Sequence, residues 1–179
     1  MSPESKLLEL WAREMIRDCL YRYCRGIDRA DEALIRAAYW PGGTDSHGAY
    51  KGSAEGFIDW AIKALPAIER GIHQIHNVLI ELHGHQAAVE SYFTALQRQP
   101  DASGRIVDVH MAGRYVDRFE KRGEEWRVAD RVVVFDWLEQ RPPQAGTEAE
   151  RFAARTPIGS RWPDDPVYRL FTASTPHAA

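Results

Sequence analysis

The hydrophobic pattern of the first 70 residues is that of helices. From residue 4 to about residue 25, apolar side chains recur at the spacing of an amphipathic helix, which Gly26 is placed to end. Asp31, a capping residue type, begins a second short helix through EALIRAAYW, up to the helix-breaking PGG. Ser53 precedes a third helix, FIDWAIKALPAIE, kinked or ended near Pro66. The sequence therefore predicts three N-terminal helices.

After residue 71 the pattern changes to β-branched and aromatic runs separated by turn signals. The runs are IHQIHNVLIEL, QAAVESYFTALQRQ, RIVDVHMAGRYVDRFE and WRVADRVVVFDWLEQ, and the turn signals are HGH, PDASG and KRGEE. They predict four long strands joined by hairpins. Because the helices come first and an antiparallel meander follows, we expect an α+β fold in which the helices pack on one face of a strongly bent, mainly antiparallel sheet.

Length and composition indicate a single domain followed by a tail. With 179 residues, 44% of them hydrophobic and 27% charged, the chain has the size and composition of one globular domain with a tail. We assign residues 1–140 to the domain and residues 141–179 to a tail that covers the barrel mouth or a neighbouring subunit. In the tail, AERFAAR predicts a short helix, and SRWPDDPVYRLF predicts a docking segment anchored by Trp162 and Tyr168.

Charge and missing motifs exclude several classes of function. The net charge of −3 gives no electrostatic basis for binding nucleic acid. No apolar run approaches the roughly 20 residues of a membrane span, and the charged N-terminus does not resemble a signal peptide, so we expect a cytoplasmic protein. Cys19 and Cys24 point in different directions on a helix, which predicts free thiols. Nucleotide-binding loops and a serine elbow are absent from the sequence, which favours acid-base groups around an apolar pocket.

Two histidines, His73 and His76, open the first of the four strands. Strand alternation places them on opposite faces unless a bulge intervenes, so they are not expected to share a metal, and no metal site is predicted. A strand histidine is commonly structural, but one beside a carboxylate can accept a proton near neutral pH. Asp28 and Asp31 are either solvated turn or capping carboxylates or, given a partner, part of such a site. Tyr23, on the apolar stripe of the first helix, lies near enough to its end to reach the same cavity as Asp28.

Arg131 lies in an apolar environment. Alternation puts it on the same face of the last strand as Val133, Phe135 and Trp137. A guanidinium there requires a carboxylate partner or an anionic ligand. The candidate partners are Asp28, Asp108 and Glu90. His110 shares a strand face with Asp108 and Arg114, and that face is either the pocket or an intersubunit surface. His47 is predicted to be a loop residue.

Four short motifs follow one another in the chain: YCRGID at 23–28, TDSHGAYKG at 44–52, HQIHN at 73–77 and WRVADR at 126–131. Their order and content resemble the SnoaL-like proteins of the nuclear transport factor 2-like, or scytalone dehydratase-like, superfamily. Within it the nearest analogies are hexachlorocyclohexane dehydrochlorinase and the bile acid 7α-dehydratases. The resemblance runs from about Glu4 to Glu139.

The resemblance implies a cone-shaped α+β barrel, often a trimer, that performs cofactor-free eliminations on hydrophobic ring compounds. Carried over position by position, it implies that His73 is the general base and Asp28 its orienting carboxylate. Tyr23 would donate a hydrogen bond to the substrate, and Arg131 would stabilise the leaving group or a developing anion. The further residues expected to contact substrate are Asn77, His110, Phe135, Trp40 and Tyr39.

We therefore predict a cofactor-independent lyase acting on an aromatic, polycyclic or steroid-like molecule. The reaction would be either a dehydratase-type elimination or the release of formaldehyde from a lignin-derived diaryl propanediol. Two alternatives stay open. The chain would be a non-catalytic ligand-binding module or small subunit of an aromatic-ring dioxygenase, or a ketosteroid-type isomerase with a carboxylate base. The expected partners are a hydrophobic small molecule and further copies of the chain, with neither nucleic acid nor membrane.

Overall fold

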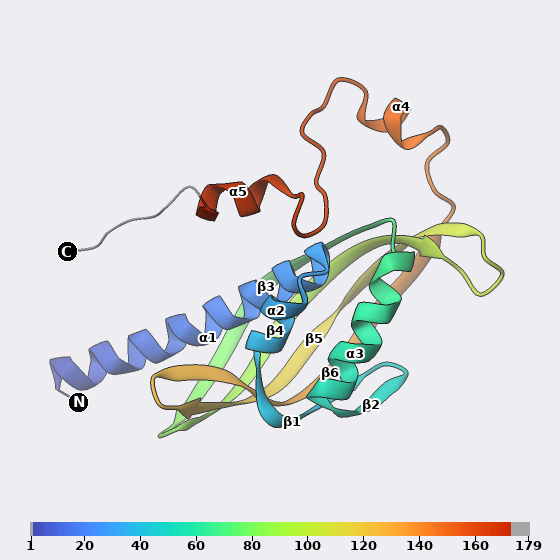
Figure 1. The fold of residues 1–179 in the computed structure, drawn as a ribbon. Coiled ribbons are helices and arrows are strands. Elements are labelled where there is room, and N and C mark those ends of the chain that lie inside the picture. The colour runs from blue at the N-terminus through green and yellow to red at the C-terminus, as the bar shows by residue number, and fades with distance from the viewer. Residues whose placement is uncertain (1, 173–179) are drawn as a thin grey trace.

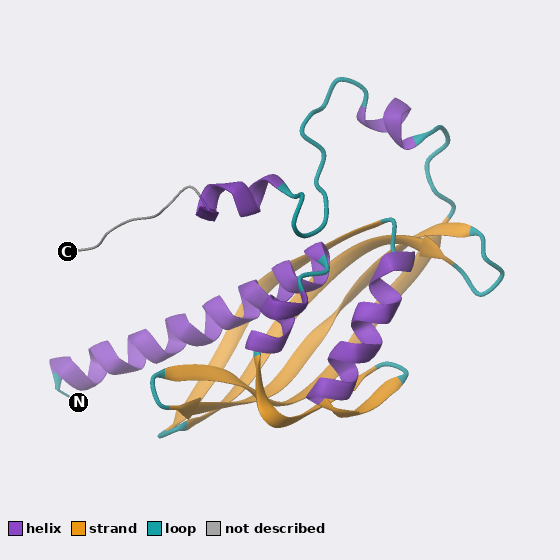
Figure 2. Cartoon of the chain, viewed as in Figure 1, coloured by secondary structure: helices purple, strands orange, loops and turns teal. Residues whose placement is uncertain are grey.

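Three helices cover the concave face of a curled six-stranded sheet (Figures 1 and 2). The computed structural model describes residues 2–172. The helices are α1 (Pro3–Arg29), α2 (Glu32–Ala37) and α3 (Ala54–Ala64), followed by the 3-10 turn η1 (Leu65–Ala67). The strands are β1 (Tyr39–His47), β2 (Tyr50–Ser53), β3 (Arg70–His83), β4 (Gln86–Pro100), β5 (Ile106–Arg122) and β6 (Glu125–Arg141), in the order β2-β1-β6-β5-β4-β3. The tail carries α4 (Glu148–Phe152) and α5 (Pro166–Thr172).

The sheet confirms the predicted meander and adds a hairpin that was not predicted. Strands β3 to β6 pair antiparallel with their sequence neighbours, whereas β1 pairs parallel with β6. The second helix ends at Ala37 and does not continue to Trp40. His47 accordingly ends a strand and is not a loop residue. The reason is tertiary, because the edge of β6 offers backbone hydrogen bonds to a segment whose local composition also suits a helix or a loop.

The helix caps follow the sequence closely. The Asp31 side chain accepts a hydrogen bond from the Leu34 N–H at 3.1 Å, and Ser53 accepts one from the Gly56 N–H at 3.1 Å. Each satisfies one of the donors that a helix leaves unpaired at its N-terminus. The short turn at Leu65–Ala67 ends α3 next to Pro66, as predicted.

Gly26 lies inside α1, although the sequence predicted that it would end the helix. The helix continues to Arg29 and ends where Ala30 takes a left-handed conformation, with φ of 51°. A Cβ atom on residue 26 would lie 2.8 Å from Ile35 Cγ1 and 3.0 Å from the Ile35 backbone nitrogen. Gly26 is therefore required by the close approach of α2, rather than by helix termination.

Gly26→Ala should lower the free energy of unfolding by about 1 kcal/mol. In an unhindered helix the same change would stabilise by roughly 1 kcal/mol. Here Ile35 is 0% exposed, so an added methyl overpacks the contact, which costs about 1–3 kcal/mol. Urea denaturation measures the difference. A variant as stable as the wild type would show that α2 moves aside freely.

A bulge in β3 begins at the second histidine of HQIHN. His76 and Asn77 together face one residue of β4. His76 lies on the outer face of the sheet, where its Nε2 is 2.9 Å from Thr94 Oγ1. His73 pairs with Ala95, which is fully buried on the inner face. The two histidines thus face opposite sides, as alternation predicted.

The remaining sequence expectations concern thiols and membranes. Cys19 and Cys24 are free and buried on α1, as predicted. Burial raises the pKa of each thiol to about 12, so both stay protonated at neutral pH. No helix within residues 2–172 is long and apolar enough to cross a membrane.

Candidate functional site

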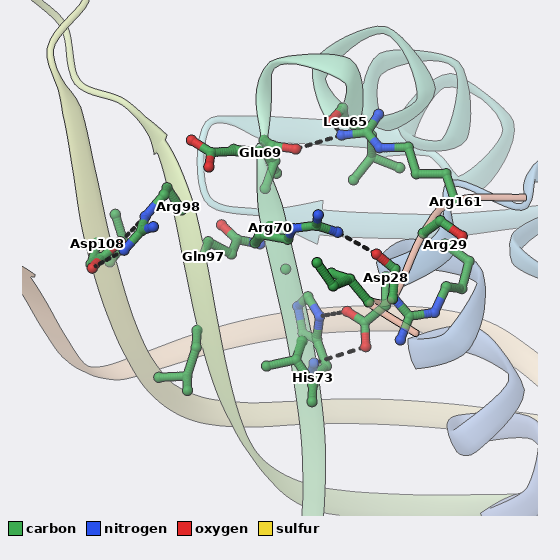
Figure 3. A pocket seen from close by; sticks show the side chains of 18 of the residues that line it. Asp28, Arg29, Leu65, Glu69, Arg70, His73, Gln97, Arg98, Asp108 and Arg161 are labelled. Carbon is green, nitrogen blue, oxygen red and sulfur yellow. Dashed lines mark hydrogen bonds and ion pairs between the residues drawn. The ribbon is translucent and has the colours of Figure 1, made fainter. Parts of the chain in front are cut away.

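The end of α1 and the start of β3 bring an imidazole and a carboxylate together. His73 Nδ1 lies 2.6 Å from Asp28 Oδ1, and the His73 backbone N–H donates to Asp28 Oδ2 at 2.9 Å (Figure 3). The two side chains are only 9% and 10% exposed. With an ionised Asp28, this geometry assigns the Nδ1 proton to the bond with the carboxylate and leaves Nε2 with a free lone pair. The pair can therefore accept a proton at Nε2 and stabilise the resulting imidazolium.

A cavity of about 760 Å³ opens beside this pair. Its walls come from the ends of α1 and β3 to β5, from η1 and from the tail, and they mix apolar side chains with ion pairs (Figure 3). Among the ion pairs, Arg98 holds Asp108 through two hydrogen bonds of 2.6 and 2.8 Å. These bonds lower the pKa of the Asp108 carboxyl, which stays ionised. A ligand in this cavity meets neutralised charges together with apolar surface.

The tail forms part of the cavity wall. Gly159, Ser160 and Arg161 line it. Arg161 Nη2 donates to the carbonyl oxygens of Leu65, at 2.6 Å, and of Ile68. The helix predicted in AERFAAR is present as α4. The tail, which includes α4, arches from the end of β6 back over the end of α1 (Figure 1).

The two expected anchors of the tail differ in their surroundings. Trp162 is 57% exposed, so its indole does not anchor the tail to this chain, and its backbone N–H donates to Arg29 O at 2.8 Å instead. Tyr168 is half-buried, and its pKa is raised first by burial and then by Asp31. The tail is held chiefly by polar contacts, which include the Arg29 ion pair with Asp165 at 3.4 Å.

Deleting residues 142–179 should weaken activity or assembly, because the deletion removes a wall of the His73 cavity. Arg161→Gln is the finer test, since it removes the guanidinium that bonds the carbonyl oxygens of Leu65 and Ile68 and leaves the rest of the tail in place. We expect a raised KM for the Arg161 variant, measured by steady-state kinetics. Arg155→Gln, at an exposed position of the same tail, is the matched control and should behave as wild type. Normal kinetics and assembly of the truncated protein would contradict the prediction.

Arg131 lies in the core, away from the His73 cavity. Its Nε and Nη2 donate to the two carboxylate oxygens of Asp117 at 2.8 and 2.7 Å, and both side chains are 0% exposed. The guanidinium carbon packs 4.3 Å from the Tyr23 ring centroid and 4.2 Å from that of Tyr115. Neither Arg131 nor Tyr23 lines the cavity. The structure therefore separates these two residues from the Asp28–His73 pair.

The partner of Arg131 is not one of the three carboxylates that we expected. In the β5–β6 hairpin, counting back from the turn would place Asp117 opposite Asp130. A bulge at Ala129 shifts the register by one residue, so that Asp117 faces Arg131. A second bulge in β6 moves Trp137 to the outer face, away from Arg131, where it is 65% exposed. Neither bulge leaves a clear signal in the sequence.

Trp40, a predicted substrate contact, does not line the His73 cavity. Its Nε1–H donates to Glu120 O at 2.8 Å, and its ring lies 5.0 Å from the Arg122 guanidinium carbon and 4.6 Å from that of Arg127. These partners belong to the β5–β6 turn region. By contrast, His110 lines the same cavity as His73.

The other three predicted contact residues are also outside the cavity wall. Asn77 is exposed in the β3 bulge and does not line the cavity of His73; its contact with substrate stays a prediction. Tyr39 is buried, and its hydroxyl donates to Asp45 Oδ2 at 2.6 Å. Phe135 lies on the inner face of β6, where it is 42% exposed and packs edge-on against Phe93.

Sequence reasoning missed Asp45, Asp117 and the inward position of His47. The motif TDSHGAYKG contained the signal for two of them, because Asp45 and His47 are two residues apart and would share a face if the segment were a strand. Among residues 2–172, no group of three or more His, Cys, Asp and Glu side chains could hold a metal ion.

Comparison with known proteins identifies the family. The model of the SnoaL-like domain matches residues 8–132, and the chain belongs to this family. A comparison with curated protein sequences finds no match. The curled sheet with its N-terminal helix is also the fold of solved structures that match most of the chain.

Solved structures share this fold at low sequence identity. A type 2 hexachlorocyclohexane dehydrochlorinase is 17% identical, with a TM-score of 0.70 over 79% of this chain and 97% of that one. A candidate scytalone dehydratase from Novosphingobium aromaticivorans is 15% identical, with a TM-score of 0.66 over 82% and 96%. The beta subunit of a candidate aromatic-ring-hydroxylating dioxygenase from the same organism is 22% identical, with a TM-score of 0.58 over 74% and 94%. At these identities the likeness establishes the fold and leaves the activity to the site.

Proposed function

We propose that the protein is a cofactor-independent lyase for a hydrophobic aromatic, polycyclic or steroid-like molecule. The observation that carries the proposal is the Asp28–His73 pair, with 2.6 Å between Oδ1 and Nδ1, at the wall of a cavity of about 760 Å³. A strand histidine with a purely structural role has no need of a nearly buried carboxylate on one nitrogen and open space beside it.

In the elimination, His73 Nε2 takes a proton from a substrate carbon. The electron pair of that C–H bond becomes the second bond of a new C=C, and the leaving group departs from the neighbouring carbon with its own bonding pair. Asp28 holds the ring in position and offsets the charge of the imidazolium. In the dehydratase form the leaving group departs as hydroxide and takes up the abstracted proton, directly or through solvent, so that one molecule of water is lost.

The same base would serve a carbon–carbon lyase. In a diaryl propanediol, His73 would take the proton of the terminal hydroxyl group. Formaldehyde then leaves as its C=O forms, and the electron pair of the broken C–C bond becomes the new C=C while hydroxide leaves the neighbouring carbon. The proton and the hydroxide balance as water. Both reactions require one base and no redox partner.

Tyr23 and Arg131 have an indirect role in this proposal. Because Asp117 neutralises Arg131 and both Tyr23 and Arg131 are buried, they support the barrel wall and its electrostatic field. A direct contact between either residue and the substrate stays a prediction, which a structure with a trapped ligand would test.

Products identify the reaction. A panel of hydroxylated aromatics, steroids and diaryl propanediols, followed by mass spectrometry, should show the loss of water or of formaldehyde. Exchange of a substrate proton with solvent and no loss of a group would indicate an isomerase. Binding without conversion, or copurification with a Rieske-type large subunit, would favour the non-catalytic module.

We also propose that the protein is a homo-oligomer, with the trimer of the family resemblance as the expected state. Exposed apolar side chains on the outer face of the sheet support it: Tyr92, Val116 and Val132. Such a surface is typical of an interface between subunits. Light scattering would measure the mass, and a monomer at micromolar concentration would contradict the proposal.

A further inference from the structure

A second carboxylate and imidazole lie side by side on the inner face of β1. His47 Nδ1 is 3.6 Å from Asp45 Oδ1. The Asp45 side chain is 0% exposed, and that of His47 is 24% exposed. Both of these atoms are buried, and neither has a hydrogen-bond partner among the described residues. Asp45 Oδ1 and His47 Nδ1 therefore face each other as a buried acceptor and a ring nitrogen without other partners among the described residues.

The neighbouring charges leave Asp45 in need of a donor. Arg131 uses Nε and Nη2 for Asp117, and only its Nη1 turns toward the Tyr39 hydroxyl, at 3.4 Å. Tyr39 in turn donates to Asp45 Oδ2. A buried carboxylate oxygen without a donor is costly, so we assign the ring proton of His47 to Nδ1, which faces Asp45 Oδ1 from 3.6 Å. This tautomer leaves the lone pair of His47 on Nε2.

The ring of His47 belongs to an aromatic wall of the barrel. It stacks on Phe57 with 4.7 Å between centroids and lies edge-on to Phe135 at 6.3 Å. Phe135 meets Phe93 at 6.5 Å, and Phe93 lies 6.4 Å from the ring of His73. The two histidines thus mark the two ends of one row of aromatic rings, and Phe135 beside His47 is 42% exposed.

We propose that His47, oriented by Asp45, is a ligand-binding residue that accepts a hydrogen bond from the hydroxyl group of an aromatic ligand packed against Phe135. The ligand hydroxyl donates to Nε2, while the Nδ1 proton stays on the imidazole and faces Asp45 Oδ1. No covalent bond changes in this contact. The inference deepens the proposed function, on which it rests only for the aromatic nature of the ligand.

Two probes of similar shape test the contact: 2-naphthol, which has a hydroxyl donor, and 2-fluoronaphthalene, which has none. Isothermal titration calorimetry should show that the wild-type protein binds 2-naphthol about tenfold more tightly, the usual effect of one hydrogen bond. His47→Leu should remove this preference. His47→Gln places a carbonyl oxygen near the former Nε2 and should retain part of it. Asp45→Asn should also remove it, because an amide NH₂ facing Nδ1 moves the ring proton to Nε2.

The ratio of the two affinities is insensitive to a general loss of stability, so a partly destabilised variant still gives an answer. His83→Leu, at the exposed end of β3, is the matched control and should keep the preference. Equal affinities in the wild type, or an unchanged preference in both His47→Leu and Asp45→Asn, would overturn the inference. So would a preference lost in His73→Gln alone, because the hydroxyl would then bind at His73. Turnover by His73→Gln tests the proposed lyase separately and does not affect this comparison.

Discussion

His73→Gln should lower turnover by about a hundredfold to ten-thousandfold, which is the usual contribution of a positioned general base. Glutamine keeps the size and polarity of the side chain and cannot take up a proton. The loss should fall on kcat, since the proton is transferred in the transition state and not on binding. Asp28→Asn should also lower kcat, because an amide at this position can leave the imidazole in the wrong tautomer. Steady-state kinetics on a substrate from the panel measures both changes.

His76→Gln is the matched control for this experiment. His76 lies three positions from His73 in the same strand but faces outward, where it contacts Thr94. The turnover of His76→Gln should stay within about twofold of wild type, because this side chain lies on the opposite face of the sheet from the cavity. Thermal denaturation of all three variants separates a loss of chemistry from a loss of folding. Near-normal kcat in both the His73 and the Asp28 variants would refute the base assignment.

Asp117→Asn should lower the free energy of unfolding by about 3–5 kcal/mol, the usual cost of leaving one member of a buried ion pair without its counter-charge. Asp117 and Arg131 are both 0% exposed, and the guanidinium packs between aromatic rings that cannot solvate it as water would. The substitution should also disturb the position of Asp45, because Arg131 contacts the Tyr39 hydroxyl, which in turn donates to Asp45. Urea denaturation measures the change.

Two comparisons isolate the effect of the buried charge. Asp136→Asn removes one of the two carboxylate partners of Arg114 on the exposed face of the sheet, the other being Glu90, and should leave stability almost unchanged. The double change Asp117→Leu with Arg131→Met should recover much of the loss, because apolar residues of similar volume then replace both charges. An Asp117→Asn variant with wild-type stability would mean that water or Asp45 compensates Arg131.

The Arg131 pair shows where sequence reasoning stops. An arginine among apolar neighbours predicts either a carboxylate partner or an anionic ligand, and the structure contains a buried carboxylate, Asp117. The identity of that carboxylate depends on a one-residue bulge at Ala129, which changes the register of the whole β5–β6 hairpin beyond it. The bulge depends on how the two strands pack in the curled sheet, and a single sequence carries no clear signal for it.

The candidate site shows the same division. The motif HQIHN and strand alternation separate His73 from His76, but the partner of His73 is 45 residues earlier in the chain. The resemblance to a family suggested Asp28, whereas periodicity alone left it as a turn or capping residue. The structure also placed Trp40 and Asn77 outside the lining of the His73 cavity and turned His47 inward, because these positions depend on β1 pairing with β6 and on the bulge in β3.

The sequence by itself determined the three N-terminal helices, the four long strands, the turns between them, two helix caps and the free thiols. These features depend on the spacing of apolar residues and on contacts within a few positions, which a single sequence records. Only the tertiary structure decided that β1 joins the sheet, that Gly26 makes room for α2, that Asp117 neutralises Arg131 and that the tail walls the His73 cavity. Each of these contacts joins segments distant in sequence, so it can form and stabilise the protein only when the sheet has curled around the helices.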